Sequence, residues 1–228
     1  MKTFIFWLIV LVSFAVISAT TVLLASGNKI NFKAKKIQKT GLIVLDSEPS
    51  DANISLCGEV QDNKTPFRKR YIEPGNYLIQ VTKDNYILWE KSVQIGEGQA
   101  YTNKDIILFL INPTVEEIKN QKDIDEFNAI LETDRTKNQG IEIKDSEIWV
   151  DDQIVARFST PILNAIWYND NHILFQKNDE IRVIEKDGSN DTMLVKLSDL
   201  RPTNFTTINS YKTLIFKDGE LLKSAKIR

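Results

Sequence analysis

The amino-acid sequence predicts a mainly β protein that begins with a membrane-spanning helix. Three observations lead to this fold class. A long stretch without charged residues opens the 228-residue chain, and short apolar runs separated by Pro, Gly, Asn and Asp follow it. In the second half, a weaker pattern of apolar runs recurs at intervals of about 40 residues. We therefore expect an anchor, a small antiparallel β-sandwich and a set of small repeated sheets, in that order.

The net charge of -2 hides an uneven distribution along the chain. Residues 1–39 contain six Lys and no acidic residue, whereas the remainder contains 23 basic and 31 acidic side chains. The acidic remainder makes nucleic acid an unsuitable partner, because binding to phosphates requires a basic face. A single Cys excludes a disulfide framework and a Cys-rich zinc module, and 42% hydrophobic content excludes wholesale disorder.

The N-terminal segment has the length and composition of a membrane span. Thr3–Asn28 contains no charged residue, and Phe4–Ala25 is dominated by Phe, Ile, Leu, Val and Ala. As a helix these 22 residues reach roughly 33 Å, enough for a hydrocarbon core of roughly 30 Å. Trp7 is placed as an interfacial aromatic residue, and Lys2 and Lys29 flank the segment. We assign residues 1–28 to a single-pass anchor in the cell membrane, with residues 3–28 contacting the lipid bilayer.

A cleavable signal peptide is the alternative to this anchor. Ile17-Ser18-Ala19 fits a small-residue cleavage site, but the apolar run continues to Ala25, beyond the roughly 7 to 15 residues of a cleaved apolar region. The basic juxtamembrane segment at 29–40 bears on orientation. Its five Lys favour a cytoplasmic C-terminal part by the positive-inside rule, and they also suit anionic headgroups or a solvated stalk.

Residues 41–112 read as short strands joined by marked turns. Apolar side chains alternate with polar ones at Ala52, Ile54 and Leu56, which predicts a strand with one buried face. Turn-forming residues separate the runs. The runs are 41–45, 52–57, a third opening at 64–67, 77–82, 86–95 and 106–110. About six short strands in 70 residues predict an antiparallel sandwich.

Several motifs in this segment resemble a known domain. They are Ser47-x-Pro49-x-x-Ala52-x-Ile54-x-Leu56-x-Gly58, Lys64-Thr65-Pro66, Pro74-Gly75-x-Tyr77 and Asp84-Asn85-Tyr86. Together they resemble the PEGA domain, a small extracytoplasmic β-sandwich of surface proteins. The resemblance implies that these residues build the fold and that the C-terminal part lies outside the membrane. Asn63 and Asn85 stand where the family usually has Gly, and Asn tolerates the left-handed backbone that such turns need.

The remaining residues are expected to form a helical linker and repeated sheets. Thr114-Val115-Glu116-Glu117 fits a capping box, which predicts a short helix from Val115 to Gln121 within a linker at 113–122. Residues 123–228 show about two and a half units of four short strands, which resembles an incomplete β-propeller. Because closure needs at least four blades, we expect a fragment, a ring that partner chains complete, or units that form an open sheet. The end of the chain within a unit favours a truncated reading frame among these.

The sequence shows no catalytic constellation, and we expect no catalytic, cofactor-binding or metal-binding residue. His172 is the only His and follows turn-forming residues, so we expect it at the surface; Cys57 is expected in a strand as a buried or half-buried thiol. Asp151-Asp152 and the segment 187–191 contain oxygen ligands for Ca²⁺, but hairpin turns favour the same residues.

The expected function is therefore binding rather than catalysis. We expect a non-catalytic, membrane-anchored bacterial surface protein in which the PEGA-like domain and the blades bind or scaffold an envelope protein or glycan. No small-molecule substrate is indicated. The alternative is a fragment of an enzyme or sensor whose active site lies in blades outside this chain.

Overall fold

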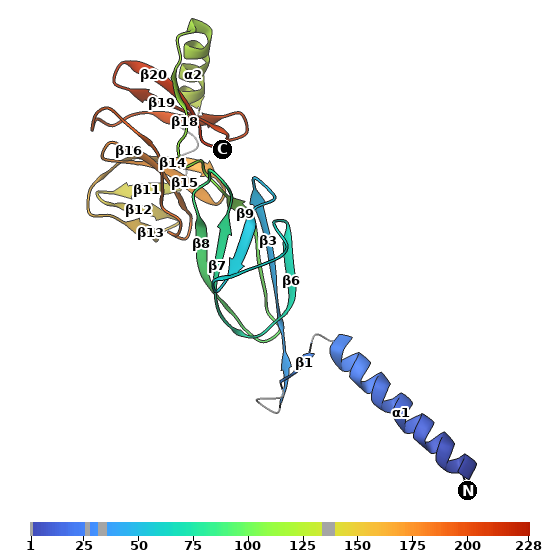
Figure 1. Ribbon diagram of the computed structural model, residues 1–228. Coiled ribbons are helices and arrows are strands. Elements are labelled where there is room, and N and C mark those ends of the chain that lie inside the picture. Colours follow the sequence, from blue (N-terminus) through green and yellow to red (C-terminus); the bar gives the residue numbers. More distant parts are fainter. Residues whose placement is uncertain (1, 26–27, 32–35, 134–139) are drawn as a thin grey trace. The chain divides into compact units, whose positions relative to one another are not determined.

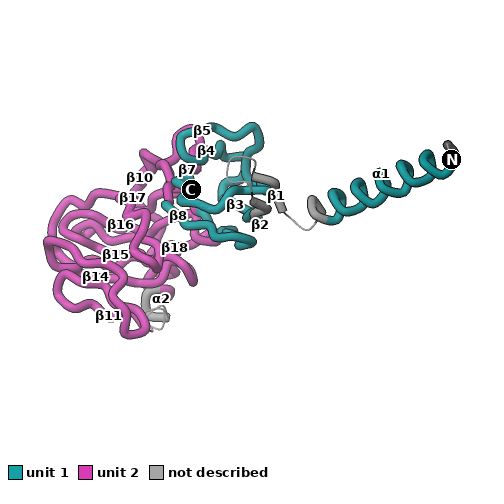
Figure 2. Tube along the Cα trace, turned by 90° about the horizontal axis from the view of Figure 1, so that it is seen from below, with its two compact units in different colours: residues 1–79, 92–106 teal, residues 80–91, 107–228 magenta. Residues whose placement is uncertain are grey.

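The computed structural model describes residues 2–25, 28–31, 36–133 and 140–228 (Figure 1). It confirms a mainly β fold with an N-terminal apolar helix and several antiparallel sheets. The chain divides into two compact units, which are coloured separately in Figure 2. The first contains residues 1–79 and 92–106, and the second contains residues 80–91 and 107–228.

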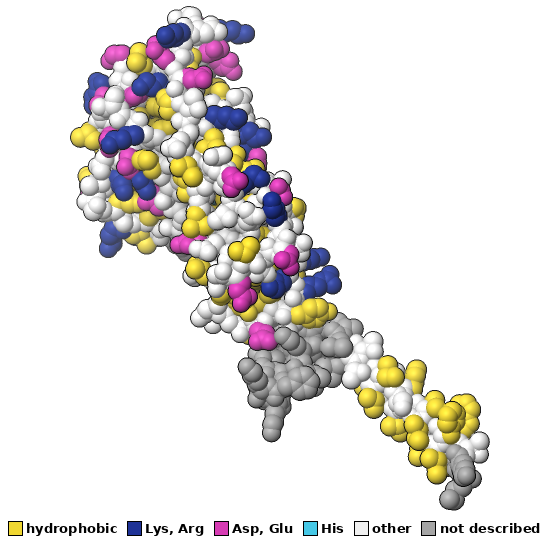
Figure 3. Space-filling view, in the orientation of Figure 1, with side chains coloured by type: hydrophobic (Ala, Val, Ile, Leu, Met, Phe, Trp, Pro, Cys, Tyr) yellow, Lys and Arg dark blue, Asp and Glu magenta, His cyan; other side chains and the backbone are white. Residues whose placement is uncertain are grey.

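Helix α1 (Lys2–Ala25) is the apolar segment that the sequence predicts. Within it, Thr3–Val22 is apolar and long enough to cross a membrane, and none of its most apolar window is buried by the rest of the protein. Figure 3 shows hydrophobic side chains on the visible face of this helix. Exposed Phe, Leu and Val side chains of this kind need lipid or another apolar cover, so α1 fits a single-pass anchor or a signal peptide.

The basic segment after α1 contains a short β-hairpin. Strands β1 (Asn28–Asn31) and β2 (Lys36–Lys39) pair antiparallel, with Ile30 opposite Ile37. Lys33 and Lys35, which belong to the predicted Lys cluster, lie outside the described residues.

Seven strands form two sheets over the region of the predicted sandwich. One sheet has the order β6-β3-β9 and the other the order β5-β4-β7-β8. The strands are β3 (Gly41–Glu48), β4 (Asn53–Leu56), β5 (Glu59–Val60), β6 (Phe67–Ile72), β7 (Gly75–Thr82), β8 (Trp89–Ile95) and β9 (Ala100–Ile107). Alternate side chains of β3 are buried, as the pattern predicts for a sheet with one apolar face.

A hydroxyl pair joins the first two sequence motifs. The Ser47 and Thr65 hydroxyls are buried and lie 2.7 Å apart, and the Thr65 hydroxyl also accepts a hydrogen bond from the Ala52 amide at 3.0 Å. The backbones of Ala52 and Thr65 are paired as well, because the Thr65 amide donates to the Ala52 carbonyl at 3.0 Å. These motif residues therefore stabilise the fold, as the resemblance implies.

The predicted turn conformations are confirmed in part. Asn85 has φ of 69°, so the expected left-handed Asn is present there. Asn63 has no positive φ, and neither does Gly75, which instead opens β7. Near these motifs the backbone is also left-handed at Asp51, Cys57 and Gly58, with φ of 62°, 51° and 86°, and at Tyr71, with φ of 61°.

The described residues of the second unit form three antiparallel sheets. The first has the order β11-β12-β13, the second β14-β15-β16-β17 and the third β10-β20-β19-β18. Their strands are β10 (Val115–Glu117), β11 (Ile141–Lys144), β12 (Glu147–Val150), β13 (Gln153–Arg157), β14 (Ile162–Asn169), β15 (His172–Lys177), β16 (Glu180–Glu185), β17 (Thr192–Lys196), β18 (Phe205–Ile208), β19 (Thr213–Asp218) and β20 (Leu221–Lys226). The described strands form no closed barrel or propeller.

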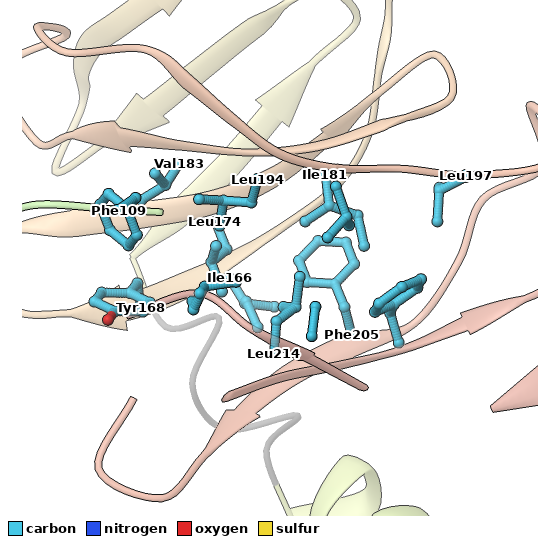
Figure 4. Packing of buried hydrophobic residues seen from close by; sticks show 14 of the residues in the cluster. Phe109, Ile166, Tyr168, Leu174, Ile181, Val183, Leu194, Leu197, Phe205 and Leu214 are labelled. Atoms are coloured by element: carbon cyan, nitrogen blue, oxygen red, sulfur yellow. The ribbon is translucent and has the colours of Figure 1, made fainter. Parts of the chain in front are cut away.

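Two hydrophobic clusters fill the spaces between consecutive sheets of this unit. The larger cluster lies between the second and third sheets and includes Tyr168, Leu174, Phe205 and Leu214 (Figure 4). A second cluster joins the first and second sheets and includes Phe175. The middle sheet is therefore covered on both faces, which explains why all of β15 except its last residue is buried.

The predicted helical linker at 113–122 is wrong. Val115–Glu117 forms strand β10, which pairs antiparallel with β20, and helix α2 (Gln121–Thr133) begins only where the predicted helix ends. The Asn120 side chain accepts a hydrogen bond from the Lys122 amide at 3.2 Å, so Asn120 is the N-cap. β10 is thus the fourth strand of the third sheet, whose other strands are β18, β19 and β20.

Candidate functional site

The only His of the chain is buried, so the expected surface position is wrong. His172 opens β15 and is 3% exposed. Its ring lies edge-on to Phe109 and Tyr168, and Nδ1 is 3.0 Å from the Asn169 side-chain oxygen. The turn residues before His172 do turn the chain, but the side chain faces inward because Phe109 and Tyr168 pack over it.

Cys57 also departs from expectation, because it is exposed rather than buried. It follows the last residue of β4 with φ of 51°, and its sulfur lies 3.8 Å from the Asn76 carbonyl oxygen. The turn that begins at Cys57 ends the alternation of β4 and places the thiol outside the core.

The acidic segments considered for Ca²⁺ serve as turns and ion-pair partners. Asp151 and Asp152 have φ of 49° and 61° and connect β12 to β13, as expected for a two-residue hairpin turn. Asp187 pairs with Lys91 at 2.5 Å, and Asp191 accepts a hydrogen bond from the Arg182 side chain at 2.7 Å. Among the described residues, no three His, Cys, Asp or Glu side chains form a group that could hold a metal ion.

The most organised polar cluster of the second unit surrounds Glu185, the last residue of β16. Glu185 is 8% exposed, and its Oε1 receives the Trp89 indole N–H and the Asn190 side-chain amide (3.0 Å). Oε2 receives the Lys91 ammonium at 2.7 Å and lies 3.0 Å from the Ser189 hydroxyl, whose single proton is shared with Asp187 Oδ1 at 2.6 Å. We call Glu185, Trp89, Asn190, Lys91 and Ser189 the Glu185 cluster.

The charges of the Glu185 cluster stabilise one another. Burial opposes ionisation of Glu185, but the hydrogen bonds from Lys91 and Trp89 and the nearby positive charge outweigh it, and the pKa of Glu185 is lowered. Burial likewise opposes the charge on Lys91, but Asp187 and Glu185 raise its pKa above 10.5. Asp187 has a lowered pKa, because Lys91 and Ser189 outweigh the effect of burial. The cluster is therefore ionised at neutral pH.

The hydrogen bonds of the Glu185 cluster hold the fold together. A carboxylate has about four acceptor sites; three protein donors occupy sites of Glu185, and the Ser189 hydroxyl lies at the fourth while also contacting Asp187. The hollow beside it, lined by His172 and Thr192 among others, has a volume of about 10 Å³. That volume holds about one water molecule, which is too small for a substrate.

The sequence contains no signal for this cluster. Trp89 and Lys91 lie more than 90 residues from Glu185 along the chain, and Glu185 ends an ordinary alternating strand. The segment 185–190 folds back through a Gly188 with φ of 83°, where a Cβ would overlap the Val155 carbonyl oxygen. Only this packing reveals that the turn residues of 187–190 serve the buried carboxylate.

The comparison with protein families concerns the sandwich region. Strands β3 to β9 and the Ser47–Thr65 hydroxyl pair are the structural counterparts of the motifs described above. Residues 40–105 match the family model of the PEGA domain. This PEGA domain covers the predicted segment 41–112 except for its last residues, and its residues 80–91 belong to the second compact unit. No curated protein matches the chain.

Proposed function

We propose that the chain is a non-catalytic, membrane-anchored surface protein whose PEGA domain and C-terminal sheets bind an envelope protein or glycan. One observation supports this proposal above the others. An apolar helix of 24 residues and a PEGA domain occur on the same chain, separated by a basic segment. A binding module attached to a membrane has this organisation, and the PEGA family is typical of surface proteins.

The proposed orientation places residues 40–228 outside the cytoplasm. The Lys residues between 29 and 39 argue for the opposite orientation by the positive-inside rule. We give more weight to the PEGA domain, because long domains translocate largely regardless of charge and the family is extracytoplasmic.

The C-terminal sheets supply the larger surface of the proposed binding module. We propose that they are blade-like, because three antiparallel sheets follow one another and hydrophobic clusters join each to the next. The absence of catalysis is part of the same proposal. The buried Glu185 carboxylate already accepts hydrogen bonds from Trp89, Lys91 and Asn190.

Protease shaving of intact cells tests this proposal. Cells that express the full chain with a C-terminal epitope are treated with protease before and after lysis, and membranes are washed at alkaline pH. We expect digestion of residues 40–228 before lysis and retention of undigested chain in washed membranes. A variant without residues 2–25 is the control and should not be retained. Protection until lysis would contradict the orientation, and release by the wash would contradict the anchor.

A further inference from the structure

A polar hollow of about 150 Å³ lies where the second sheet of the second unit connects to the third. It contains backbone and side chains of the connection between β17 and β18 and of the end of β19. The lining residues are Leu197, Asp199, Arg201, Pro202, Thr203, Asn204, Lys217, Asp218 and Gly219. Leu197 also belongs to the large hydrophobic cluster, at whose edge it is labelled in Figure 4. The hollow therefore rests on packed core.

Buried polar side chains hold the walls of the hollow in place. Gln176 is fully buried; its amide N–H groups donate to the Arg201 carbonyl at 2.9 Å and its oxygen accepts from the Thr203 amide at 2.7 Å. Asn164 donates to the Thr203 carbonyl at 2.9 Å. On the opposite wall, the Asp218 carboxylate accepts the Ser198 amide at 2.7 Å. A loop held by these partly buried hydrogen bonds has a defined shape before any ligand arrives.

The acceptor groups in the hollow already have protein partners. Asp199 Oδ2 accepts both Nε and Nη2 of Arg201, at 2.9 and 2.7 Å. Asp218 accepts the Ser198 hydroxyl at 2.5 Å and the Lys223 ammonium at 2.6 Å. Both carboxylates are thus paired with a cation, and their pKa values are lowered, chiefly because Arg201 donates to Asp199 and because Lys223 and Ser198 outweigh the burial of Asp218.

The charged groups that remain available in the hollow are donors. Arg201 uses only Nε and Nη2 on Asp199, which leaves further guanidinium N–H groups. The side chains of Lys217 and Asn204 line the hollow and make no hydrogen bond or ion pair with a residue that the structure describes. The ammonium of Lys217 adds a positive charge that no described carboxylate pairs with, although Glu220 lies close enough for its charge to act on Arg201.

We propose that this hollow binds the acidic group, a carboxylate or a phosphate, of a small ligand or of one unit of a larger one. A planar guanidinium with free N–H groups matches the oxygens of either group, and the Lys217 charge and the Asn204 amide complete the set of donors. The volume accommodates a single acidic unit. This proposal names the ligand chemistry of the binding function proposed above. It rests on that function only because it treats the chain as a binding module.

Ligand-observed nuclear magnetic resonance titrations of the full chain in detergent micelles test the site. The probes are inorganic phosphate, glucuronate and neutral glucose, of which the first two separate a phosphate site from a carboxylate site. We expect saturable binding of at least one anion and none of glucose. Arg201→Ala should weaken the binding about tenfold or more, the effect of losing a charge-assisted hydrogen bond.

Two further variants keep the test decisive. Arg157→Ala is the matched control, because its guanidinium is paired with Glu147 and its side chain is as exposed as that of Arg201, at 70% against 69%. Lys217→Ala removes an ammonium without a protein partner, so it should weaken anion binding while leaving the fold unchanged. Equal binding by Arg201→Ala, Lys217→Ala and Arg157→Ala overturns the proposal, as does an absence of anion binding or equal binding of glucose. None of these results depends on the membrane orientation, which protease shaving measures separately.

Discussion

At the scale of single residues, the Glu185 cluster shows how the protein tolerates a buried charge. The Glu185 carboxylate has a cation, an indole N–H, an amide and a hydroxyl around it, so its loss of hydration is compensated. Removing the charge would leave the Lys91 ammonium, whose side chain is 20% exposed, with only Asp187 as a carboxylate partner.

Glu185→Gln should lower the free energy of unfolding by about 2 to 3 kcal/mol, since a buried charge pair is broken and Lys91 stays behind. Urea unfolding of the full chain in micelles, followed by Trp fluorescence, measures this change. The matched control is Glu147→Gln. Glu147 also accepts a Trp N–H and a cation, from Trp149 and Arg157, but the Arg157 side chain is 70% exposed, so the effect should be smaller. Equal losses in the two variants would contradict the role of burial.

At the scale of secondary-structure elements, helix α2 covers the outer face of the third sheet. Figure 1 shows α2 beside β18 to β20, and Phe127 of this helix is 1% exposed in a cluster with Ile215 and Leu222. Successive side chains of β19 face opposite sides of the sheet. Leu214 and Phe216 pack into the large hydrophobic cluster on one side, so Ile215, on the other side, needs a separate apolar partner. The helix supplies that cover.

Phe127→Ala should lower the free energy of unfolding by about 3 kcal/mol, the usual cost of removing a buried aromatic ring. The same urea titration measures the loss. Glu126→Ala, at the adjacent exposed position of α2, is the control and should change stability little. If both variants unfold alike, α2 does not stabilise the sheet.

Strand β10 shows why the linker at 113–122 was predicted wrongly. The capping-box pattern at Thr114 to Glu117 satisfies a local rule, but Val115 and its neighbours pair with β20 and Ile118 donates its amide to the Leu222 carbonyl at 2.8 Å. A sheet edge satisfies these backbone groups at once, whereas an isolated helical turn is costly to nucleate. The N-cap Asn120 was present in the sequence, and it marks the true start of α2.

At the scale of the whole molecule, the carboxylates of the second unit predict how stability varies with pH. Glu185, Asp187 and Asp218 all have lowered pKa values in the folded protein, relative to 4.5 for Glu and 3.8 for Asp. The unfolded chain therefore binds protons more readily as the pH falls. The stabilisation from these groups is complete above their unfolded pKa values and is lost as the pH falls through the folded ones.

The free energy of unfolding should thus be nearly constant from pH 7 to about pH 5 and fall below about pH 4.5. Urea titrations at pH 7, 5, 4 and 3 measure this dependence. Glu185→Gln should show a shallower acid limb, because one of the responsible groups is absent. Lys91 affects stability at alkaline pH instead. Because its pKa is raised in the folded protein, its contribution to the free energy of unfolding is lost only above about pH 10.5. A free energy of unfolding that rises between pH 5 and pH 3 would contradict the stabilising role of these ionised carboxylates.

The sequence by itself determined the apolar helix α1, most of the short strands and the match to the PEGA domain. These features depend on local periodicity and turn chemistry, as at Ala52 to Leu56 or at Asn85. Only the tertiary structure decided the burial of His172, the exposure of Cys57, the pairing of β10 with β20 and the polar hollow beside Arg201. Each of these depends on residues that are distant in the chain, as Trp89 and Glu185 are, and no local pattern encodes which of them will meet.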